Sequence, residues 1–209
     1  MAVMLSVHPQ SPQGRHIARA VAALRADGVV VYPTDTVYGL GCDITSRQAV
    51  ERITDIKGRD PKKPMSFVCA DLTHISRYAR VSNFAYRILK RHLPGAYTFV
   101  LEANREVPKM LLTKQKTVGI RIPDHAVALA LVRELDNPVL STSANLCGEE
   151  PINNPAEIQQ VLGKQVDVIL DCEVLPRVPS TVISLVGDKV EVLREGAGDA
   201  SFFLELDAG

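Results

Sequence analysis

The sequence predicts an α/β fold, in which helices pack on one twisted, mixed β-sheet within a single domain. Short β-branched runs alternate with helix-like segments along most of the 209 residues, and this interleaving is typical of α/β proteins. A chain of 209 residues still suits one hydrophobic core. We see no internal repeat and no linker rich in Gly, Pro or Ser. We therefore expect one domain over residues 1–209, with a core of about 14–205.

The first two helices and the first strand are indicated by apolar spacing. Ile17, Val21 and Leu24 recur at helical intervals ahead of Gly28. A β-branched run at residues 29–32 then predicts a strand. The next apolar face begins after Ser46, a good cap, and ends at Gly58. Lys57 and Arg59 are therefore expected at a helix exit.

The remaining elements continue this alternation. Further strands are predicted at residues 65–69, 97–102, 118–122, 139–141, 166–170, 181–185 and 189–194. Helices are predicted at residues 71–79, 83–92, 125–135 and 155–162. The last two strands flank residues 186–188, and we expect them to form an antiparallel hairpin.

Composition limits the classes of function. Lys plus Arg balance Asp plus Glu at 24 each, so no global basic field would draw the protein onto nucleic acid. Any cationic site must be local, although local clusters are also typical of solvated faces. No apolar run reaches the roughly 18 residues of a membrane span, and the start does not resemble a signal peptide. We expect a cytoplasmic protein without a membrane partner.

Cysteine and histidine spacing indicates no dedicated metal site. The four cysteines form no C-x-x-C pair, and the five histidines include no pair at helical ligand spacing. Reduced thiols are expected. Any metal is expected to arrive with a substrate.

Two polar triplets are candidates for anion binding. Lys57 and Arg59 are two cations that would face one anion if their segment were extended. The alternative is that Lys57 only complements the helix C-terminus. Ser143 and Asn145 follow an apolar run, which places them near the carboxyl end of a strand, where α/β sheets commonly bind ligands. Their ordinary alternative is a turn.

Further polar residues stand at the ends of predicted elements or interrupt them. Arg121 breaks an apolar strand, and a buried guanidinium requires an acid or an anionic ligand. Gly39 and Gly41 would let the backbone turn tightly near Thr36. Together with Ser180 and Arg194 in similar positions, these residues suggest one shared cavity.

The ordered motifs resemble the YrdC/YciO family. Besides the two triplets they comprise residues 32–41 (YPTDTVYGLG), 94–101 (PGAYTFVL) and 119–123 (GIRIP). Better known members of that family are threonylcarbamoyl-adenylate synthases of tRNA modification. The resemblance extends from about residue 14 to residue 194 and implies the YrdC-like fold in its short, single-domain form.

The resemblance also implies a reaction and a set of site residues. L-Threonine, bicarbonate and ATP, with Mg²⁺ arriving on ATP, would give threonylcarbamoyl-adenylate and pyrophosphate. A downstream tRNA-modification transferase complex would then use the adenylate to form N6-threonylcarbamoyladenosine in tRNA. The implied catalytic tetrad is Lys57, Arg59, Ser143 and Asn145. Implied nucleotide contacts are Arg59, Lys63, Thr117, Ser143, Asn145 and Arg194. Implied threonine contacts are Thr36, Arg121, Ser141 and Ser180.

Departures from the family pattern keep alternatives open. Val68 stands where several relatives have a histidine that helps to bind the amino acid, and Lys63 replaces an asparagine. The sequence of residues 67–72 (FVCADL) is similar to that of the YciO branch. One alternative is a YciO-like protein that binds double-stranded RNA or tRNA without synthase activity. Another is a related synthase that uses a different acceptor.

Overall fold

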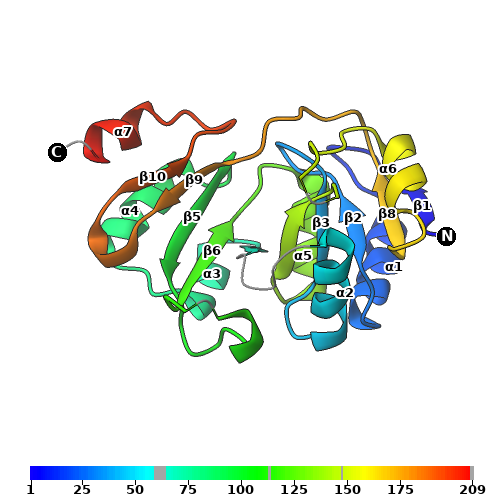
Figure 1. Cartoon of the computed structure of the whole chain (residues 1–209), viewed down its shortest axis with the longest axis horizontal. Coiled ribbons are helices and arrows are strands. Elements are labelled where there is room, and N and C mark those ends of the chain that lie inside the picture. Colours follow the sequence, from blue (N-terminus) through cyan, green and yellow to red (C-terminus); the bar gives the residue numbers. More distant parts are fainter. Residues whose placement is uncertain (59–64, 113, 147, 208–209) are drawn as a thin grey trace.

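The computed structural model describes residues 1–58, 65–112, 114–146 and 148–207. Within these ranges the strands form one 10-stranded sheet in the order β1-β8-β2-β3-β7-β4-β6-β5-β9-β10 (Figure 1). The strands are β1 (Val3–Ser6), β2 (Val30–Tyr32), β3 (Gly39–Asp43), β4 (Ser66–Val68), β5 (Tyr97–Glu102), β6 (Thr117–Arg121), β7 (Val139–Ser143), β8 (Val168–Asp171), β9 (Thr181–Ser184) and β10 (Glu191–Arg194). The helices are α1 (Gly14–Arg25), α2 (Arg47–Lys57), α3 (Leu72–Tyr78), α4 (Asn83–His92), α5 (Ala126–Leu135), α6 (Pro155–Leu162) and α7 (Ser201–Asp207).

The sheet is mixed, as predicted. β8 runs parallel to both β1 and β2, and β4 runs parallel to β6. β7 is antiparallel to both of its neighbours, β3 and β4. The predicted C-terminal hairpin is confirmed, because β9 and β10 pair antiparallel. The α/β fold class is therefore confirmed.

Alternate strand residues supply two cores on opposite faces of the sheet. Val30 and Tyr32 belong to the core that holds α1 and α5, whereas Val31 belongs to the other. That second core contains buried residues of the remaining helices, among them Ile53, Ile75, Leu89, Ile158 and Phe203. This division follows from the period of two along a strand. None of the helices within the described ranges has both the length and the apolar character needed to cross a membrane.

Helix α2 begins after Ser46 and ends before Gly58, as the sequence predicts. The Ser46 side chain accepts a hydrogen bond from the Ala49 backbone N–H at 3.1 Å, which satisfies an otherwise unpaired N-terminal donor. Gly58 follows with φ of 52°, in the left-handed region that favours glycine. Lys57 is thus the last helical residue, as expected for a helix exit, while Arg59 lies outside the described residues.

The prediction of a tight turn at Gly39 and Gly41 is wrong. Both residues lie in β3, and neither has positive φ. Their lack of a side chain serves close packing, because a Cβ at Gly39 would meet the Tyr32 ring at 2.9 Å. At Gly41 a Cβ would lie 2.4 Å from a methyl of Val139. Sequence analysis also missed β1 and α7.

Candidate functional site

A cavity of about 480 Å³ lies on one face of the sheet, across seven neighbouring strands, from β3 to β10. Its floor is built from alternate strand residues, such as Ser141 and Ser143 of β7 or Gly119 and Arg121 of β6. The residues between them point to the opposite face and are buried in the core; they include Phe67, Phe99, Ile120, Leu140 and Ile183. The volume falls within the range of small-molecule sites.

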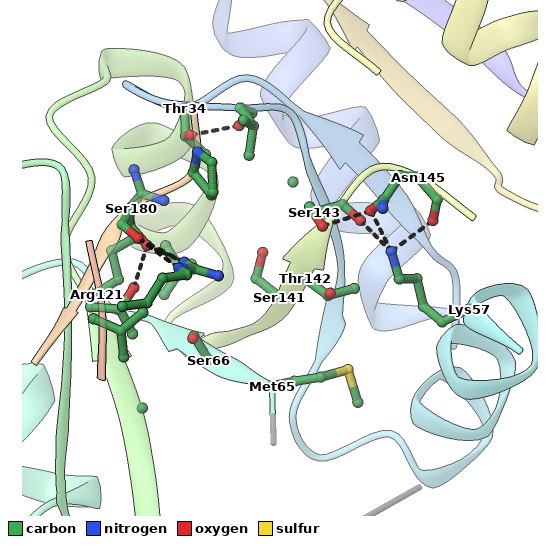
Figure 2. A pocket seen from close by; sticks show the side chains of 18 of the residues that line it. Thr34, Lys57, Met65, Ser66, Arg121, Ser141, Thr142, Ser143, Asn145 and Ser180 are labelled. Atoms are coloured by element: carbon green, nitrogen blue, oxygen red, sulfur yellow. Dashed lines mark hydrogen bonds between the residues drawn. The ribbon is translucent and has the colours of Figure 1, made fainter. Parts of the chain in front are cut away.

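One end of the cavity joins the two triplets. The Lys57 ammonium donates to the backbone oxygens of Ser143 at 3.0 Å and Asn145 at 2.7 Å. It also donates to the side-chain oxygen of Asn145, which accepts a further hydrogen bond from the Ser143 hydroxyl. Figure 2 shows these three side chains together at one end of the cavity. We call them the Lys57 cluster.

The other end contains Arg121. Its guanidinium donates to the Asp35 carboxylate and, at 2.8 Å, to the Thr36 hydroxyl. Arg121 is only 8% exposed, and its buried Nε has no hydrogen-bond partner. The salt bridge that we predicted as an alternative is therefore present, while the same side chain also lines the cavity.

A second guanidinium lies near the first. Arg194 also lines the cavity and donates to the backbone oxygen of Ser180 at 2.7 Å. Burial lowers the pKa of Arg194, and the neighbouring charge of Arg121 lowers it further. The hydroxyls of Ser180 and Thr98 are hydrogen bonded at 2.8 Å beside this pair. Two cations and two hydroxyls are a suitable environment for a carboxylate or another anion.

The floor between the two ends is polar and held in place. The Tyr32 hydroxyl donates a hydrogen bond to Ser141 at 2.7 Å, with the ring lying across Gly39 and Gly41, and burial raises the pKa of Tyr32 to about 12. Ser66 faces Ser141 across the β4–β7 pair, and both lie between the ends in Figure 2. Val68, the position of the expected histidine, is paired with Arg121 in the β4–β6 register.

Most of the predicted residues that the structure describes lie in this one cavity. The lining includes Lys57, Thr117, Arg121, Ser141, Ser143, Asn145, Ser180 and Arg194. Thr36 is fully buried and supports Arg121 from behind, and it is not among the described lining residues. Arg59 and Lys63 lie outside the described residues, so their predicted roles stay predictions.

Three polar lining residues escaped the sequence analysis. Ser66, Thr98 and Thr142 all line the cavity. The signal for two of them was the alternation itself: Ser66 precedes the apolar Phe67, and Thr98 precedes the apolar Phe99. Small polar residues at every second strand position indicate that this part of the sheet face is not covered by a helix.

Comparison with known proteins shows the family to which the chain belongs. A family model that carries the names Sua5, YciO and YrdC, described as "Telomere recombination", matches residues 22–196. The chain belongs to the Sua5/YciO/YrdC family. Its fold confirms this relationship, with a TM-score of 0.93 to the crystal structure of Escherichia coli YciO, which it covers completely at 43% identity.

Members of the Sua5/YciO/YrdC family that resemble this chain carry two kinds of name. The uncharacterized protein YciO of E. coli K12 is 44% identical over 206 residues, covering 98% of this chain and all of YciO. A threonylcarbamoyl-AMP synthase of Idiomarina loihiensis is 36% identical over 148 residues, covering 69% of this chain and 79% of that enzyme. The predicted similarity to the YciO branch is thus confirmed within a family that includes named synthases.

The chain also resembles the solved structure of a Sua5 protein that contains a bound ligand. The chain superposes on P. abyssi Sua5 complexed with L-threonine with a TM-score of 0.91 at 28% identity. The match covers 98% of this chain and 61% of that protein. The shared part is therefore the whole of the sheet-and-helix unit described above.

Proposed function

We propose that this protein is an L-threonylcarbamoyladenylate synthase, which makes threonylcarbamoyl-AMP and pyrophosphate from L-threonine, bicarbonate and ATP. The observation that supports the proposal is a single cavity with two differently equipped ends. The Lys57 cluster offers an ammonium, a hydroxyl and an amide at one end. Arg121 and Arg194 offer guanidinium groups at the other. An amino acid and a nucleotide would each find a suitable partner.

The proposed reaction has two steps. The threonine amine attacks bicarbonate, and loss of water gives a carbamate. A carbamate oxygen then attacks the α-phosphorus of ATP, and the bond to the β-phosphate oxygen breaks as pyrophosphate leaves. Negative charge develops on the phosphoryl oxygens, and fixed donors such as those of the Lys57 cluster stabilise it without reorganising. Arg121, aided by the hydroxyls of Ser180 and Thr98, would hold the threonine carboxylate.

Magnesium would enter this site with ATP. None of the described residues that line the cavity is Asp or Glu, and Mg²⁺ in nucleotide sites commonly depends on phosphates and water for most of its ligands. The lining fits a metal carried by the substrate's phosphates. When bound, the ion would neutralise charge on the departing pyrophosphate.

A second candidate is a synthase for another amino acid. Val68 lies beside Arg121 in the sheet register and lines the cavity, so the neighbour of the proposed carboxylate site is apolar. A site that lacks a polar partner for a substrate hydroxyl discriminates poorly in favour of threonine. The 44% identity to YciO also keeps this candidate open.

The deciding experiment measures pyrophosphate release by the purified protein with ATP, Mg²⁺ and bicarbonate, with and without each amino acid. We expect release that requires L-threonine. Arg194→Gln should lower it by about tenfold to a hundredfold, because a charge-assisted hydrogen bond is lost. Arg133→Gln, an exposed site on α5, is the matched control and should leave the rate unchanged.

Other outcomes identify the alternatives. Faster release with a different amino acid would replace threonine and favour the second candidate. No release with any amino acid, despite ATP binding, would reject the synthase and leave the RNA-binding alternative. That alternative predicts an affinity for double-stranded RNA or tRNA that falls steeply as salt rises. The absence of RNA binding at low salt would reject it in turn.

A further inference from the structure

Three ligand-type side chains from distant parts of the sequence meet outside the cavity. They are His125, which precedes α5, and Cys172 and Glu173, which follow β8. One ligand atom from each lies within 4.8 Å of the others. None of the three is among the described residues that line the cavity.

We propose that His125, Cys172 and Glu173 form a zinc site. Imidazole, thiolate and carboxylate are the three ligand types that Zn²⁺ takes in proteins. The combination of one soft sulfur with nitrogen and oxygen disfavours Mg²⁺ and Ca²⁺, which prefer oxygen ligands alone. A water molecule would supply the fourth ligand, since three protein ligands leave one tetrahedral position open.

The Cys172–Glu173 pair is held by a buried tyrosine. Tyr38 is fully buried, and its hydroxyl accepts from the Cys172 backbone N–H at 3.3 Å and donates to the Glu173 backbone oxygen at 2.8 Å. One side chain thus anchors the backbone on both sides of the peptide between the two ligands. Such outer groups orient metal ligands in known sites.

His125 presents an unused nitrogen. Its Nε2 is buried and has no hydrogen-bond partner, whereas its Nδ1 accepts from the Val127 backbone N–H at a long 3.3 Å. A buried polar atom without a partner is costly. Metal binding at Nε2 would remove that cost, while the ring proton moves to Nδ1 and the Val127 hydrogen bond is given up.

The proposed site requires a small closure. Ligand atoms around a tetrahedral zinc ion, bonded at about 2.0–2.3 Å, lie roughly 3.3–3.8 Å apart. Because the three atoms lie within 4.8 Å, the side chains need to approach by about 1 Å, and Glu173 is exposed and free to do so. Cys172 would release its thiol proton to solvent as the Zn–S bond forms.

The ion would join two segments that lead to the cavity. His125 follows Arg121 by four residues, and the segment after Glu173 leads to Ser180. A zinc ion here would therefore brace the Arg121 end without contacting the substrate. Our expectation of no metal site considered only spacing along the sequence, which cannot detect ligands from separate elements.

The test is titration of the full chain with Co²⁺, whose absorption reports thiolate ligation, followed by displacement with Zn²⁺. We expect a sulfur-to-cobalt charge-transfer band that one equivalent of Zn²⁺ abolishes. Cys172→Ser should remove the band. His125→Asn should weaken the affinity while keeping a good cap on α5, because asparagine is a favoured N-cap residue. Cys147→Ser is the matched control and should leave the band intact.

Three results would overturn the proposal: no stoichiometric Co²⁺ or Zn²⁺ binding, a band that survives in Cys172→Ser, or a band that disappears in Cys147→Ser. Thermal unfolding gives an independent measure, since a ligand that binds only the folded state raises the melting temperature. Zn²⁺ should raise it for the wild type and not for Cys172→Ser. An equal rise in both would also reject the site.

Discussion

At the scale of single residues, Asn145 connects the two sequence triplets. Its side-chain oxygen accepts from both Lys57 and Ser143, and its amide nitrogen donates to the backbone of Glu149. Asn145 is only 8% exposed, so these contacts are made largely away from water. The residue therefore organises the Lys57 cluster and also presents the cluster to the cavity.

We predict that Asn145→Asp separates stability from activity. The new carboxylate would pair with the Lys57 ammonium, which partly offsets the lost hydrogen bond to the Glu149 backbone, so the free energy of unfolding should fall by no more than about 2 kcal/mol. The same charge would repel ATP phosphates and lower pyrophosphate release by about tenfold or more. Chemical denaturation and the pyrophosphate assay measure the two effects. Asn83→Asp, exposed at the start of α4, is the control, and a fully active Asn145→Asp would contradict the proposed phosphate end.

We also predict that acidification weakens the fold through His74. Burial lowers the pKa of His74 below its usual 6.5, and Arg77 lowers it further against the opposing charges of Asp71 and Asp136. Well above pH 6.5 the histidine is neutral in both the folded and the unfolded state, so it does not change the free energy of unfolding. As the pH falls below 6.5, the unfolded chain binds a proton that the folded protein resists, so stability decreases.

Urea unfolding at about pH 7.5 and pH 5.5, on either side of the ordinary histidine pKa, measures this effect. His74→Gln should reduce the loss of stability between the two values, because glutamine does not titrate. His8→Asn, at an exposed histidine, provides the control. An identical pH dependence in wild type and His74→Gln would refute the assignment.

At the scale of elements, the two faces of the sheet differ: one packs against helices and the other carries the cavity. The face that packs on α2, α3, α4 and α6 is apolar, while the opposite face carries small and polar residues across β7, β4, β6 and β5. Gly39 and Gly41 in β3 allow the Tyr32 ring to lie against the strand. Tyr32 in turn reaches Ser141 on the cavity floor.

Adding a methyl group within β3 should therefore destabilise the protein. In Gly41→Ala the new Cβ would lie 2.4 Å from Val139 Cγ1 and 2.9 Å from the Tyr32 ring. We expect a loss of about 1–3 kcal/mol, the usual cost of overpacking. Gly14→Ala is the matched control: no atom lies within 4 Å of the added methyl, and alanine in a helix is favoured by up to about 1 kcal/mol. Equal stabilities of the two variants would disprove the packing role.

At the scale of the whole molecule, the C-terminal segment completes the structure. After β10 the chain turns back to α7, which lies near β10 at the end of the molecule opposite α1 and α6 (Figure 1). Phe203 of α7 is fully buried and packs near the rings of His92, Tyr97 and Phe99. Thr181 donates to the backbone oxygen of Gly198, which ties this segment to β9 beside the cavity.

Phe203→Ala should consequently cost about 3–5 kcal/mol, the range for removing a buried aromatic side chain. Leu204→Ala, at the next residue, is 43% exposed and should change stability by about 0.5 kcal/mol or less. Thermal or chemical unfolding distinguishes the two. A mild effect of Phe203→Ala would mean that α7 is an appendage and not a part of the core.

Several elements were predictable from local patterns, and the exceptions have physical reasons. The Ser46 cap, the apolar face of α2 and the ending at Gly58 are local signals that the structure retains. β3 was missed because glycine is common in turns and its presence suggested one. The strand conformation of this segment depends on pairing with β2 and β7. β1 has only four residues and one buried side chain, so it offers little periodicity.

By itself, the amino-acid sequence determined the family, the fold class and the residue types of the cavity. Apolar periodicity and the order of motifs are properties of the sequence and can be recognised without the fold. Only the tertiary structure decided which polar groups meet. Lys57 reaches Ser143 across 86 positions of sequence, and Arg121 pairs with Asp35 across 86 as well. His125 and Cys172 likewise meet only in the folded chain. Such contacts depend on strand order and register, and neither quantity is encoded in any local stretch of residues.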